Sequence, residues 1–350
     1  MKKRYIILIT LILLMIIPVI AFYCSDDSII VNPLPEDISK SKTIILHHTS
    51  SSPYAQKIKL LLGYTETKWL SVIAPPGTPR PVQELLADGY SRRIPIMQIG
   101  ADIFCDTDII TNELAEITEK RELGRIYSTF EIDAFVGRAE TDAFQFMLNS
   151  ISKWKLVKGY FNNLSFRKFV LFIVDRSTAL SGEQTQKYSP EEAQNLVSEY
   201  FIDLNKKLKT NQFLFTQDKP TIADFSAFHM MWYKESLNDL SIPDNLQSLK
   251  KWYKKMKSFG NGFRYEIYPE DAVEIAKLNS PRVIPDSMKV SPNIGMEISL
   301  KPTDVVGELT PPVTGILVGE NKYKYIIKRE TVETGIIHIH FPKKAYGACL

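Results

Sequence analysis

Residues 43–63 read TIILHHTSSSPYAQKIKLLLG, and the fold can be worked outward from this stretch. Its apolar run at 44–46 predicts a short buried strand. Ser52 and Pro53 then predict a helix start, because a serine hydroxyl caps free helix amides and a proline at the first helical position gives up no hydrogen bond. Apolar residues follow at helical spacing until Gly63, which is typical of a helix end. The stretch therefore predicts a strand, a polar turn and a helix.

Strands and helices continue to alternate up to residue 120. Two short apolar runs around a glycine-containing turn predict a hairpin, since a tight turn joins neighbouring antiparallel strands. The predicted strands are 68–73, 94–99 and 103–105, and the predicted helices are 81–87 and 106–120. The resulting order β-α-β-α-β-β-α predicts a mixed sheet with helices on both faces.

The rest of the chain changes character twice. From residue 128 the apolar spacing is helical, and the candidate helices are 129–151, 165–177, 189–209, 221–236, 246–258 and 269–277. Further on, a small and mostly antiparallel β module is predicted from β-type runs at 304–309, 313–318, 323–329 and 335–341. We therefore expect an α/β domain at 43–123, an all-helical domain at 128–280 and a β module at 281–345, after a linker at 24–42.

The amino terminus predicts a targeting segment at residues 1–23. Positive residues at 2–4 precede an apolar run at 6–22, whose length lies between a signal-peptide core and the shortest spanning helices. Tyr23 is too large to stand before Cys24 in a lipoprotein signal, and aromatic residues also disfavour ordinary signal cleavage. We therefore predict an uncleaved, single-pass signal anchor through residues 6–22, with cleaved export as the alternative. The positive flank would place the folded part on the exported, periplasmic or lumenal side.

Composition excludes several classes of protein. Hydrophobic residues make up 44% of the 350 residues and charged residues 24%, as in ordinary folded proteins, so extensive disorder is not expected. The net charge of +3, with both signs interleaved, gives no basis for nucleic-acid binding. Cys24, Cys105 and Cys349 are scattered without metal-type spacing, so we expect neither a disulfide framework nor a bound metal.

Three junctions next to the predicted strands carry side chains with chemistry. At the first, the helix start favours an anion, and the Ser52 hydroxyl can donate to a bound thiol and lower its pKa. At the second, Pro95 marks a strand start, and a cis bond there would free the backbone of Ile94 for a peptide ligand. At the third, Asp106 can accept from an ammonium, while Thr107 and the helix amides hold a carboxylate. Structural alternatives stay open: plain N-caps at the two helix starts and a trans proline.

In this order, the three junctions resemble those of the glutathione S-transferase family, and the resemblance covers residues 43 to about 260. It implies a thioredoxin-like glutathione-binding domain followed by an all-helical domain of the glutathione-transferase type. The residues that it assigns to glutathione are the catalytic Ser52, Ile94, whose backbone pairs with the cysteinyl part, the cis-proline Pro95, and the γ-glutamyl-binding pair Asp106 and Thr107.

Residues 221–224, Thr-Ile-Ala-Asp, match a capping box that starts a buried helix in the second domain of the family, and we expect it to serve folding alone. The chain also departs from the family. Asp106 replaces the commoner glutamate and is one methylene shorter. The basic residue for the glycyl carboxylate is not evident, and the candidates are Lys68, Arg92 and Arg93.

The resemblance implies an enzyme that binds glutathione as a co-substrate and conjugates its thiol to an apolar small-molecule electrophile. We also expect a homodimer. The alternative is a non-catalytic binding or scaffold protein that keeps the transferase fold and is tethered to a membrane. Two histidine pairs stand outside this scheme. His47 and His48 are expected to be solvated, and His338 and His340 share one face of a strand without a third metal ligand.

Overall fold

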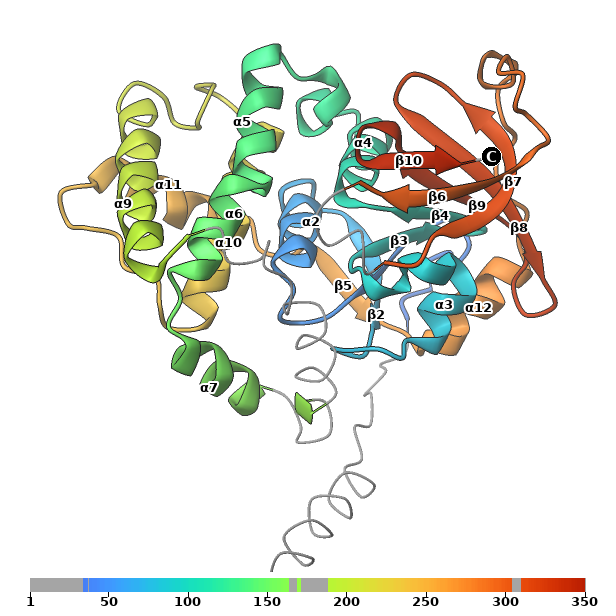
Figure 1. Cartoon of the computed structure of the whole chain (residues 1–350), viewed down its shortest axis with the longest axis horizontal. Coiled ribbons are helices and arrows are strands. Elements are labelled where there is room, and N and C mark those ends of the chain that lie inside the picture. The colour runs from blue at the N-terminus through green and yellow to red at the C-terminus, as the bar shows by residue number, and fades with distance from the viewer. Residues whose placement is uncertain (1–33, 37, 164–168, 171–187, 304–309, 350) are drawn as a thin grey trace, which may run out of the picture.

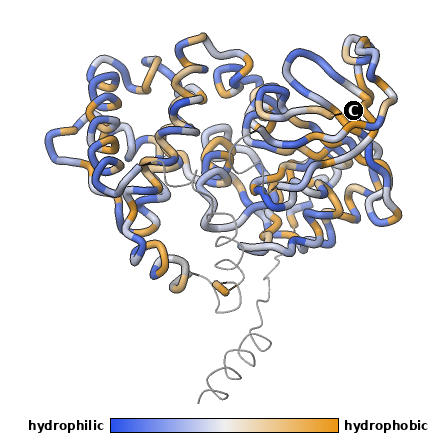
Figure 2. Tube along the Cα trace, viewed as in Figure 1, coloured by the Kyte–Doolittle hydropathy of each residue, from blue (hydrophilic) through white to orange (hydrophobic). Residues whose placement is uncertain are grey.

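Figure 1 shows the fold in a computed structural model of the chain, which describes residues 34–36, 38–163, 169–170, 188–303 and 310–349. A β-sheet with its covering helices lies beside a bundle of helices, and α2 (Pro53–Tyr64) stands between them (Figure 1). Hydrophobic and hydrophilic residues alternate along the helices and strands of both parts, as Figure 2 shows. The predicted segments at 1–23 and 304–309, and most of 165–177, lie outside the described residues.

The first part of the chain forms the predicted thioredoxin-like sheet. Its further elements are β1 (Ile44–His48), β2 (Lys68–Ile73), α3 (Pro81–Ala87), the 3-10 helix η1 (Asp88–Arg92), β3 (Ile96–Ile99), β4 (Asp102–Cys105) and α4 (Thr107–Ile117). β1 pairs in parallel with β2 and antiparallel with β3, which pairs antiparallel with β4. Because successive residues of a strand face opposite sides, Leu46 packs in the core that includes α2 and α4, and Ile45 packs in the core that includes α3.

The second part is the predicted helical bundle. Its helices are α5 (Phe130–Glu140), α6 (Asp142–Asn149), α7 (Lys153–Asn163), α9 (Pro190–Lys207), α10 (Ile222–Ser236) and α11 (Gln247–Lys257). The single helix predicted at 129–151 is divided at Thr141, whose backbone leaves the helical region. The Thr141 hydroxyl donates to the carbonyl of Gly137 at 2.9 Å, a local bond that is known to bend helices.

Asp224 is a buried anchor at the start of α10. Its carboxylate accepts from the amides of Leu214 and Thr221, both at 2.9 Å, and from the indole Nε1 of Trp252 at 2.8 Å. The carboxylate therefore fulfils its half of the predicted capping box. The predicted capping box is present, and the Thr221 hydroxyl also lies 3.3 Å from the Asp224 carboxylate. Through Leu214 and Trp252 the same carboxylate joins two further segments of the bundle to this helix end.

After α11 the chain returns to the sheet. β5 (Phe263–Glu266) pairs in parallel with β2, and α12 (Pro269–Lys277) joins α3 in the core below the sheet. Buried Ala272 and Ala276 let α12 approach that core closely. Residues 263–277 thus pack with the sheet, although the sequence analysis grouped them with the helical domain.

The carboxyl-terminal region is rich in β-strands, as predicted. We call residues 281–349 the β extension. It contains β6 (Glu297–Pro302), β7 (Val313–Glu320), β8 (Lys324–Thr331), β9 (Gly335–Pro342), the 3-10 helix η7 (Lys343–Ala345) and β10 (Tyr346–Cys349). It is continuous with the first sheet, because β9 pairs in parallel with β4. The strands form one ten-stranded sheet in the order β10-β6-β7-β8-β9-β4-β3-β1-β2-β5 (Figure 1).

Polar contacts also fasten the β extension to β4. His340 Nε2 contacts the carboxylate of Asp102 at 2.8 Å, and the His340 ring stacks on Phe104 with a centroid distance of 4.4 Å. Arg282 donates to Asp102 through its backbone amide at 2.9 Å and to Glu113 through Nη1 at 2.6 Å. His340 therefore serves as an anchor between neighbouring strands.

His47 and His48, which we expected to be solvated, are fully buried in β1. Gln83 donates to His47 Nδ1 at 3.1 Å, so His47 Nε2 donates to Gln98 at 3.0 Å. His48 Nε2 contacts the Ser71 hydroxyl at 2.9 Å. Burial lowers the pKa of His47 to about 4 and that of His48 to about 3. The prediction failed because the strand extends beyond its apolar run, and neighbouring elements supply polar partners for both ring nitrogens of His47 and for Nε2 of His48.

The prediction of a membrane-anchored protein with an exported folded part is contradicted. No helix within the described residues is both long and apolar enough to cross a membrane. Residues 6–22, to which the prediction referred, are themselves outside the described part of the chain. The apolar run was an ambiguous signal, because its length falls short of an ordinary spanning helix.

Candidate functional site

The three predicted junctions meet at one end of the sheet. β1 ends shortly before Ser52. β3 runs antiparallel to β1 and begins at that same end, where Ile96 pairs with His47. β4 runs antiparallel to β3, so its last residue pairs with the same Ile96. The turn before β3 and the helix start after β4 therefore lie at the end of the sheet where Ser52 lies.

Ser52 caps α2. Its Oγ accepts a hydrogen bond from the amide of Ala55 at 3.2 Å, and its extended backbone (φ −76°, ψ 120°) is that of an N-cap. The side chain is half-buried, and its hydroxyl donates to no acceptor within the described residues. The hydroxyl can therefore donate a hydrogen bond to an anion that lies in front of this 12-residue helix.

The peptide bond between Ile94 and Pro95 is cis, one of the two alternatives that the sequence left open. The hydrogen-bond ladder between β1 and β3 starts at Ile96, so the peptide groups of Ile94 lie outside it. Pro95 is buried and Ile94 is half-buried. This arrangement leaves the backbone of Ile94 in position to pair with an extended peptide.

Arg80 holds the segments around this turn, and the sequence analysis missed it. Its side chain is 2% exposed and donates to the carbonyls of Pro75 at 2.8 Å and Ser91 at 2.9 Å. It also donates to the carbonyls of Pro76 at 2.9 Å and Arg92 at 2.8 Å. The guanidinium thus ties the proline-rich loop to the residues that lead into Ile94. A lone arginine within that loop was the signal available in the sequence.

Asp106 and Thr107 begin α4. The Asp106 carboxylate accepts from the amide of Asp108 at 3.0 Å and caps the helix. Asp106 has φ +94° and ψ 142°, a conformation that residues with a side chain rarely adopt and that is concentrated at functional sites. Thr107 is buried as the first residue of the helix. Asp106 is thus an N-cap, the alternative that the sequence left open, and its strained backbone gives a reason to expect more than capping.

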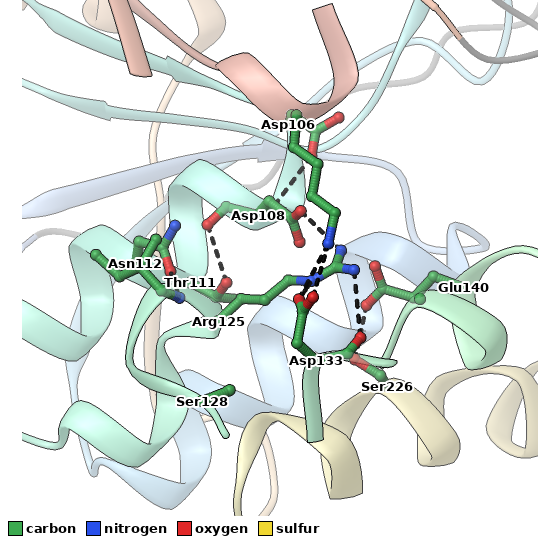
Figure 3. Close-up of polar contacts among 12 residues, drawn as sticks. Asp106, Asp108, Thr111, Asn112, Arg125, Ser128, Asp133, Glu140 and Ser226 are labelled. Atoms are coloured by element: carbon green, nitrogen blue, oxygen red, sulfur yellow. Dashed lines mark hydrogen bonds and ion pairs between the residues drawn. The ribbon is translucent and has the colours of Figure 1, made fainter. Parts of the chain in front are cut away.

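Asp106 lies at one end of a cluster of charged side chains (Figure 3). Burial, together with the charges of Asp108 and Glu140, raises the pKa of Asp106 to about 7, and the nearby Arg93 only partly offsets this. The ionised carboxylate is therefore disfavoured until a cation arrives. A ligand ammonium is a cation of suitable size for this position.

Arg125 balances the charge of the cluster. Its Nη1 lies 2.9 Å from the Asp108 carboxylate, and its Nε lies 2.5 Å from the carboxylate of Asp133 on α5 (Figure 3). Desolvation acts against the guanidinium, but Asp108, Glu140 and Asp133 together raise the pKa of Arg125. Arg125 therefore joins the start of α4 to the helical bundle.

Lys57 makes a second polar connection between the two parts. Its side chain on α2 is fully buried, and its ammonium pairs with Glu140 on α5. The Ser226 hydroxyl on α10 donates to the same carboxylate at 2.6 Å. Burial acts to raise the pKa of Glu140, but Lys57 holds it below its usual range. A lysine among the apolar residues of one helix was the sequence signal for this pair.

Aromatic side chains lie beside the start of α2. The Tyr54 ring stacks on Phe144 of α6 with a centroid distance of 5.1 Å and is tilted against His229 of α10 at 5.2 Å. Tyr54 itself is half-buried. Tyr54 and Phe144, both half-buried, thus form an aromatic surface at the first turn of α2, beside Ser52.

The three basic candidates for a second carboxylate differ in position. Lys68 starts β2, which is parallel to β1, so it lies at the end of the sheet opposite to Ser52 and is excluded. Arg92 and Arg93 lie at the correct end, just before Ile94. Arg93 Nε donates to the Thr310 hydroxyl at 3.3 Å, so Arg93 also contacts the β extension.

Comparisons with known proteins support the two-domain fold. Residues 46–122 match the model of the glutathione S-transferase N-terminal domain, and residues 176–261 match that of the C-terminal domain. No curated protein matches the sequence.

Among solved structures, the first of the three below supports this fold. A GST-like protein from Pseudomonas syringae is 24% identical with a TM-score of 0.66, and the match covers 88% of this chain and 99% of that one. A glutathione S-transferase from Rhodospirillum rubrum is 16% identical with a TM-score of 0.44, covering 62% of this chain and 88% of that one. FzlA from C. crescentus is 17% identical with a TM-score of 0.41, covering 62% and 88%.

The first of these likenesses reaches past the two domains. Residues after 280 make up one fifth of this chain, so a match over 88% of it includes part of the β extension. The chain therefore carries the two-domain fold of the glutathione S-transferases, a thioredoxin-like domain and a helical domain, with a β-rich extension built onto its sheet.

Proposed function

We propose that this protein binds glutathione and activates its thiol for conjugation to an apolar electrophile. The observation that supports this most is the convergence of Ser52, the cis Ile94–Pro95 turn and the Asp106–Thr107 helix start at one end of the sheet. A hydroxyl donor, a free stretch of backbone and a charged helix start are the three features that a thiol-containing peptide with a zwitterionic end requires.

In this proposal Ser52 stabilises the thiolate of glutathione. The thiol loses its proton to water, and the sulfur anion accepts a hydrogen bond from the Ser52 hydroxyl near the positive end of α2. The thiolate then attacks an electrophilic carbon. A sulfur–carbon bond forms, and the bond to the leaving group breaks with its electron pair, so the products are a thioether and an anion. The aromatic surface of Tyr54 and Phe144 suits an apolar substrate.

The two ends of the peptide would be held by different groups. The backbone of Ile94 pairs with the cysteinyl residue in extended form. Asp106 accepts from the γ-glutamyl ammonium, and Thr107 with the α4 amides binds the carboxylate beside it. We place the glycyl carboxylate near Arg92 or Arg93. The expected homodimer stays a prediction, which the mass of the protein in solution will test.

A second candidate is a glutathione-binding protein without conjugating activity. The observation that favours it is the hydrogen bond from the Ala55 amide to Ser52 Oγ, because this bond already gives the serine a complete structural role as a helix cap.

The two candidates differ in their response to Ser52→Ala in the full chain. If the hydroxyl stabilises the thiolate, kcat/KM for conjugation of a small aryl halide falls about 10- to 100-fold, the worth of one hydrogen bond to a charged group. Binding of an S-alkylated glutathione, which has no thiol, stays within about twofold because the peptide contacts remain.

Ser189→Ala is the matched control, since Ser189 is also a serine N-cap, on α9 and away from the site. It is expected to lower the free energy of unfolding by about 1 kcal/mol, as Ser52→Ala does, because a helix cap is lost. Conjugation should be unchanged. A wild-type protein that binds glutathione but does not conjugate it identifies the second candidate as correct. Failure of the wild-type protein to bind glutathione in a calorimetric titration overturns both.

A further inference from the structure

The β extension packs against the residues that precede the cis proline. Arg93 Nε donates to the hydroxyl of Thr310 in the extension at 3.3 Å. Gly89 in η1 approaches the Pro311 backbone so closely that a Cβ atom would lie 2.4 Å from its carbonyl oxygen. This distance leaves no room for any side chain, so glycine is required at position 89. The segment that leads into Ile94 is therefore clamped between Arg80 on one side and the extension on the other.

The β extension also reaches the charged cluster below Asp106. Lys344 in η7 pairs with Asp133 on α5 at 2.8 Å. Asp133 contacts Arg125, which in turn contacts Asp108 (Figure 3). One chain of ion pairs thus runs from the extension through the helical bundle to the first turn of α4, where the γ-glutamyl group is expected.

Tyr346, the first residue of β10, brings a third contact. Its ring is 4% exposed and packs against Phe341 and Tyr90, with centroid distances of 5.0 Å and 6.5 Å. Its hydroxyl is buried and has no hydrogen-bond partner within the described residues. Asp106 and Arg93 lie close enough to influence the Tyr346 hydroxyl electrostatically. An unpaired buried hydroxyl is unusual, because buried polar groups nearly always have partners.

We propose that the β extension forms a third wall of the ligand site, next to the end of the sheet and the helical bundle. In this wall Thr310 positions Arg93, Lys344 positions Asp133, and Tyr346 positions Asp106, all for the charged amino-acid end of the ligand. This inference rests on the proposed function, since it takes that end to be the γ-glutamyl group of glutathione. The three residues act through their neighbours and are positioning residues. The ligand's ammonium binds Asp106, and the Tyr346 hydroxyl turns toward the carboxylate once it is ionised.

All the titratable and charged groups that face Asp106 bear on this step. The charges of Asp108 and Glu140 disfavour the ionised form of Asp106, whereas the charge of Arg93 favours it. Burial and the charge of Asp106 in turn raise the pKa of the Cys105 thiol. Burial and the negative charge of Asp106 act to raise the pKa of both Tyr90 and Tyr346. Tyr90 also forms a hydrogen bond with the backbone of Asp106. In this proposal, removing the Tyr346 hydroxyl takes away a donor that would stabilise the ionised carboxylate.

The test combines three conservative changes, Thr310→Val, Lys344→Met and Tyr346→Phe, in the full chain. Each removes a polar group and keeps the volume of the side chain. Calorimetry then compares the Kd of glutathione with that of the dipeptide Cys-Gly, which lacks the γ-glutamyl group. We expect glutathione to bind about 3- to 10-fold more weakly to the variant, with Cys-Gly unchanged within about twofold.

The matched control is a triple variant of the same residue types elsewhere in the extension, Lys301→Met, Thr314→Val and Tyr323→Phe, all exposed side chains. It is expected to bind both ligands as the wild type does. Should the positioning variant lose thermal stability, Tyr346→Phe alone, measured from pH 6 to 8, replaces it. In that variant we expect the rise of glutathione affinity with pH to move to higher pH, which a purely structural role would not cause.

The outcomes are distinct. Equal loss of affinity for glutathione and Cys-Gly, or no loss for either, overturns the third wall while the proposed function stands. A loss confined to glutathione, absent from the control, supports it. Failure of the wild-type protein to bind glutathione overturns the proposed function and this inference with it.

Discussion

Asp106 combines a strained backbone with a carboxylate that the fold holds largely protonated up to about pH 7. Because its pKa is raised on folding, the folded state binds more protons than the unfolded state between about pH 4 and pH 7. The free energy of unfolding of the ligand-free protein therefore falls as the pH rises through this window. Above about pH 7 the full cost of the ionised Asp106 carboxylate is present. A residue that destabilises the free protein is expected where binding repays the loss.

Asp106→Asn tests this assignment. Asparagine caps a helix and tolerates positive φ, so the variant keeps the local structure and loses only the charge. We expect thermal unfolding at pH 8 to show the variant about 1–3 kcal/mol more stable than the wild type, which allows for partial solvent screening of the half-buried group. At pH 4 the difference should vanish.

The same variant should bind glutathione more weakly. Wild-type affinity is expected to rise between pH 6 and 8 as Asp106 ionises, and the variant should show no such rise. Asp203→Asn, an exposed aspartate on α9, is the control and should change neither property. A variant that is less stable at pH 8, or that keeps the pH dependence of binding, would show that Asp106 is an ordinary cap.

Single residues differ in how far their roles could be predicted. Ser52, Pro95 and Asp106 were found because capping and proline geometry depend on neighbours in the chain. Arg80 and Lys57 were missed because charged side chains are expected at the surface. Their burial depends on carbonyls and a carboxylate that only the folded chain brings to them.

At the scale of the elements, the start of α10 is the strongest case of a side chain that joins segments distant in the sequence. Asp224→Ala leaves the amides of Leu214 and Thr221 and the indole of Trp252 without an acceptor in a buried place. We expect a loss of about 3–5 kcal/mol in the free energy of unfolding, measured with urea.

Two comparisons calibrate that measurement. Thr221→Val removes only a hydroxyl that donates at 3.3 Å and should cost about 1 kcal/mol. Asp244→Ala, at a side chain that is 99% exposed, should cost less than about 0.5 kcal/mol. If Asp224→Ala costs no more than Thr221→Val, the carboxylate is a local cap and the bundle does not depend on it.

Helices and strands were predicted well where a periodic pattern in the sequence determines them. They were predicted poorly where their formation depends on a strand that is distant in the sequence. The helices at 189–209 and 221–236 match α9 and α10 closely, because caps mark their starts. The break at Thr141 was missed, since a single side chain that bonds backward along the helix leaves the periodicity intact. β5 was missed because its four residues form a strand only beside β2.

For the whole molecule, the main departure from the sequence analysis is the continuity of the sheet. A β module was predicted at the carboxyl terminus, and the β-strands are present. Their attachment to β4 could not be read from the sequence, because strand pairing across more than 200 residues leaves no local pattern. The consequence is a core shared by the thioredoxin-like domain and the extension, in which Ile103 of β4 and Ile339 of β9 are neighbours.

A shared core predicts that damage to the extension spreads to the ligand site. Ile339 is fully buried, so Ile339→Ala should cost about 2–5 kcal/mol and, in amide hydrogen exchange, speed exchange in β3 and β4 as well as in β8. Leu204→Ala, an equally buried change in α9, should speed exchange within the helical bundle and spare β9. An extension that folded as a separate module would confine the effect of Ile339→Ala to β6–β10. Faster exchange at Cys105 and Asp106 is the expected result, because the strand that carries them to the ligand site is held on its outer edge by β9.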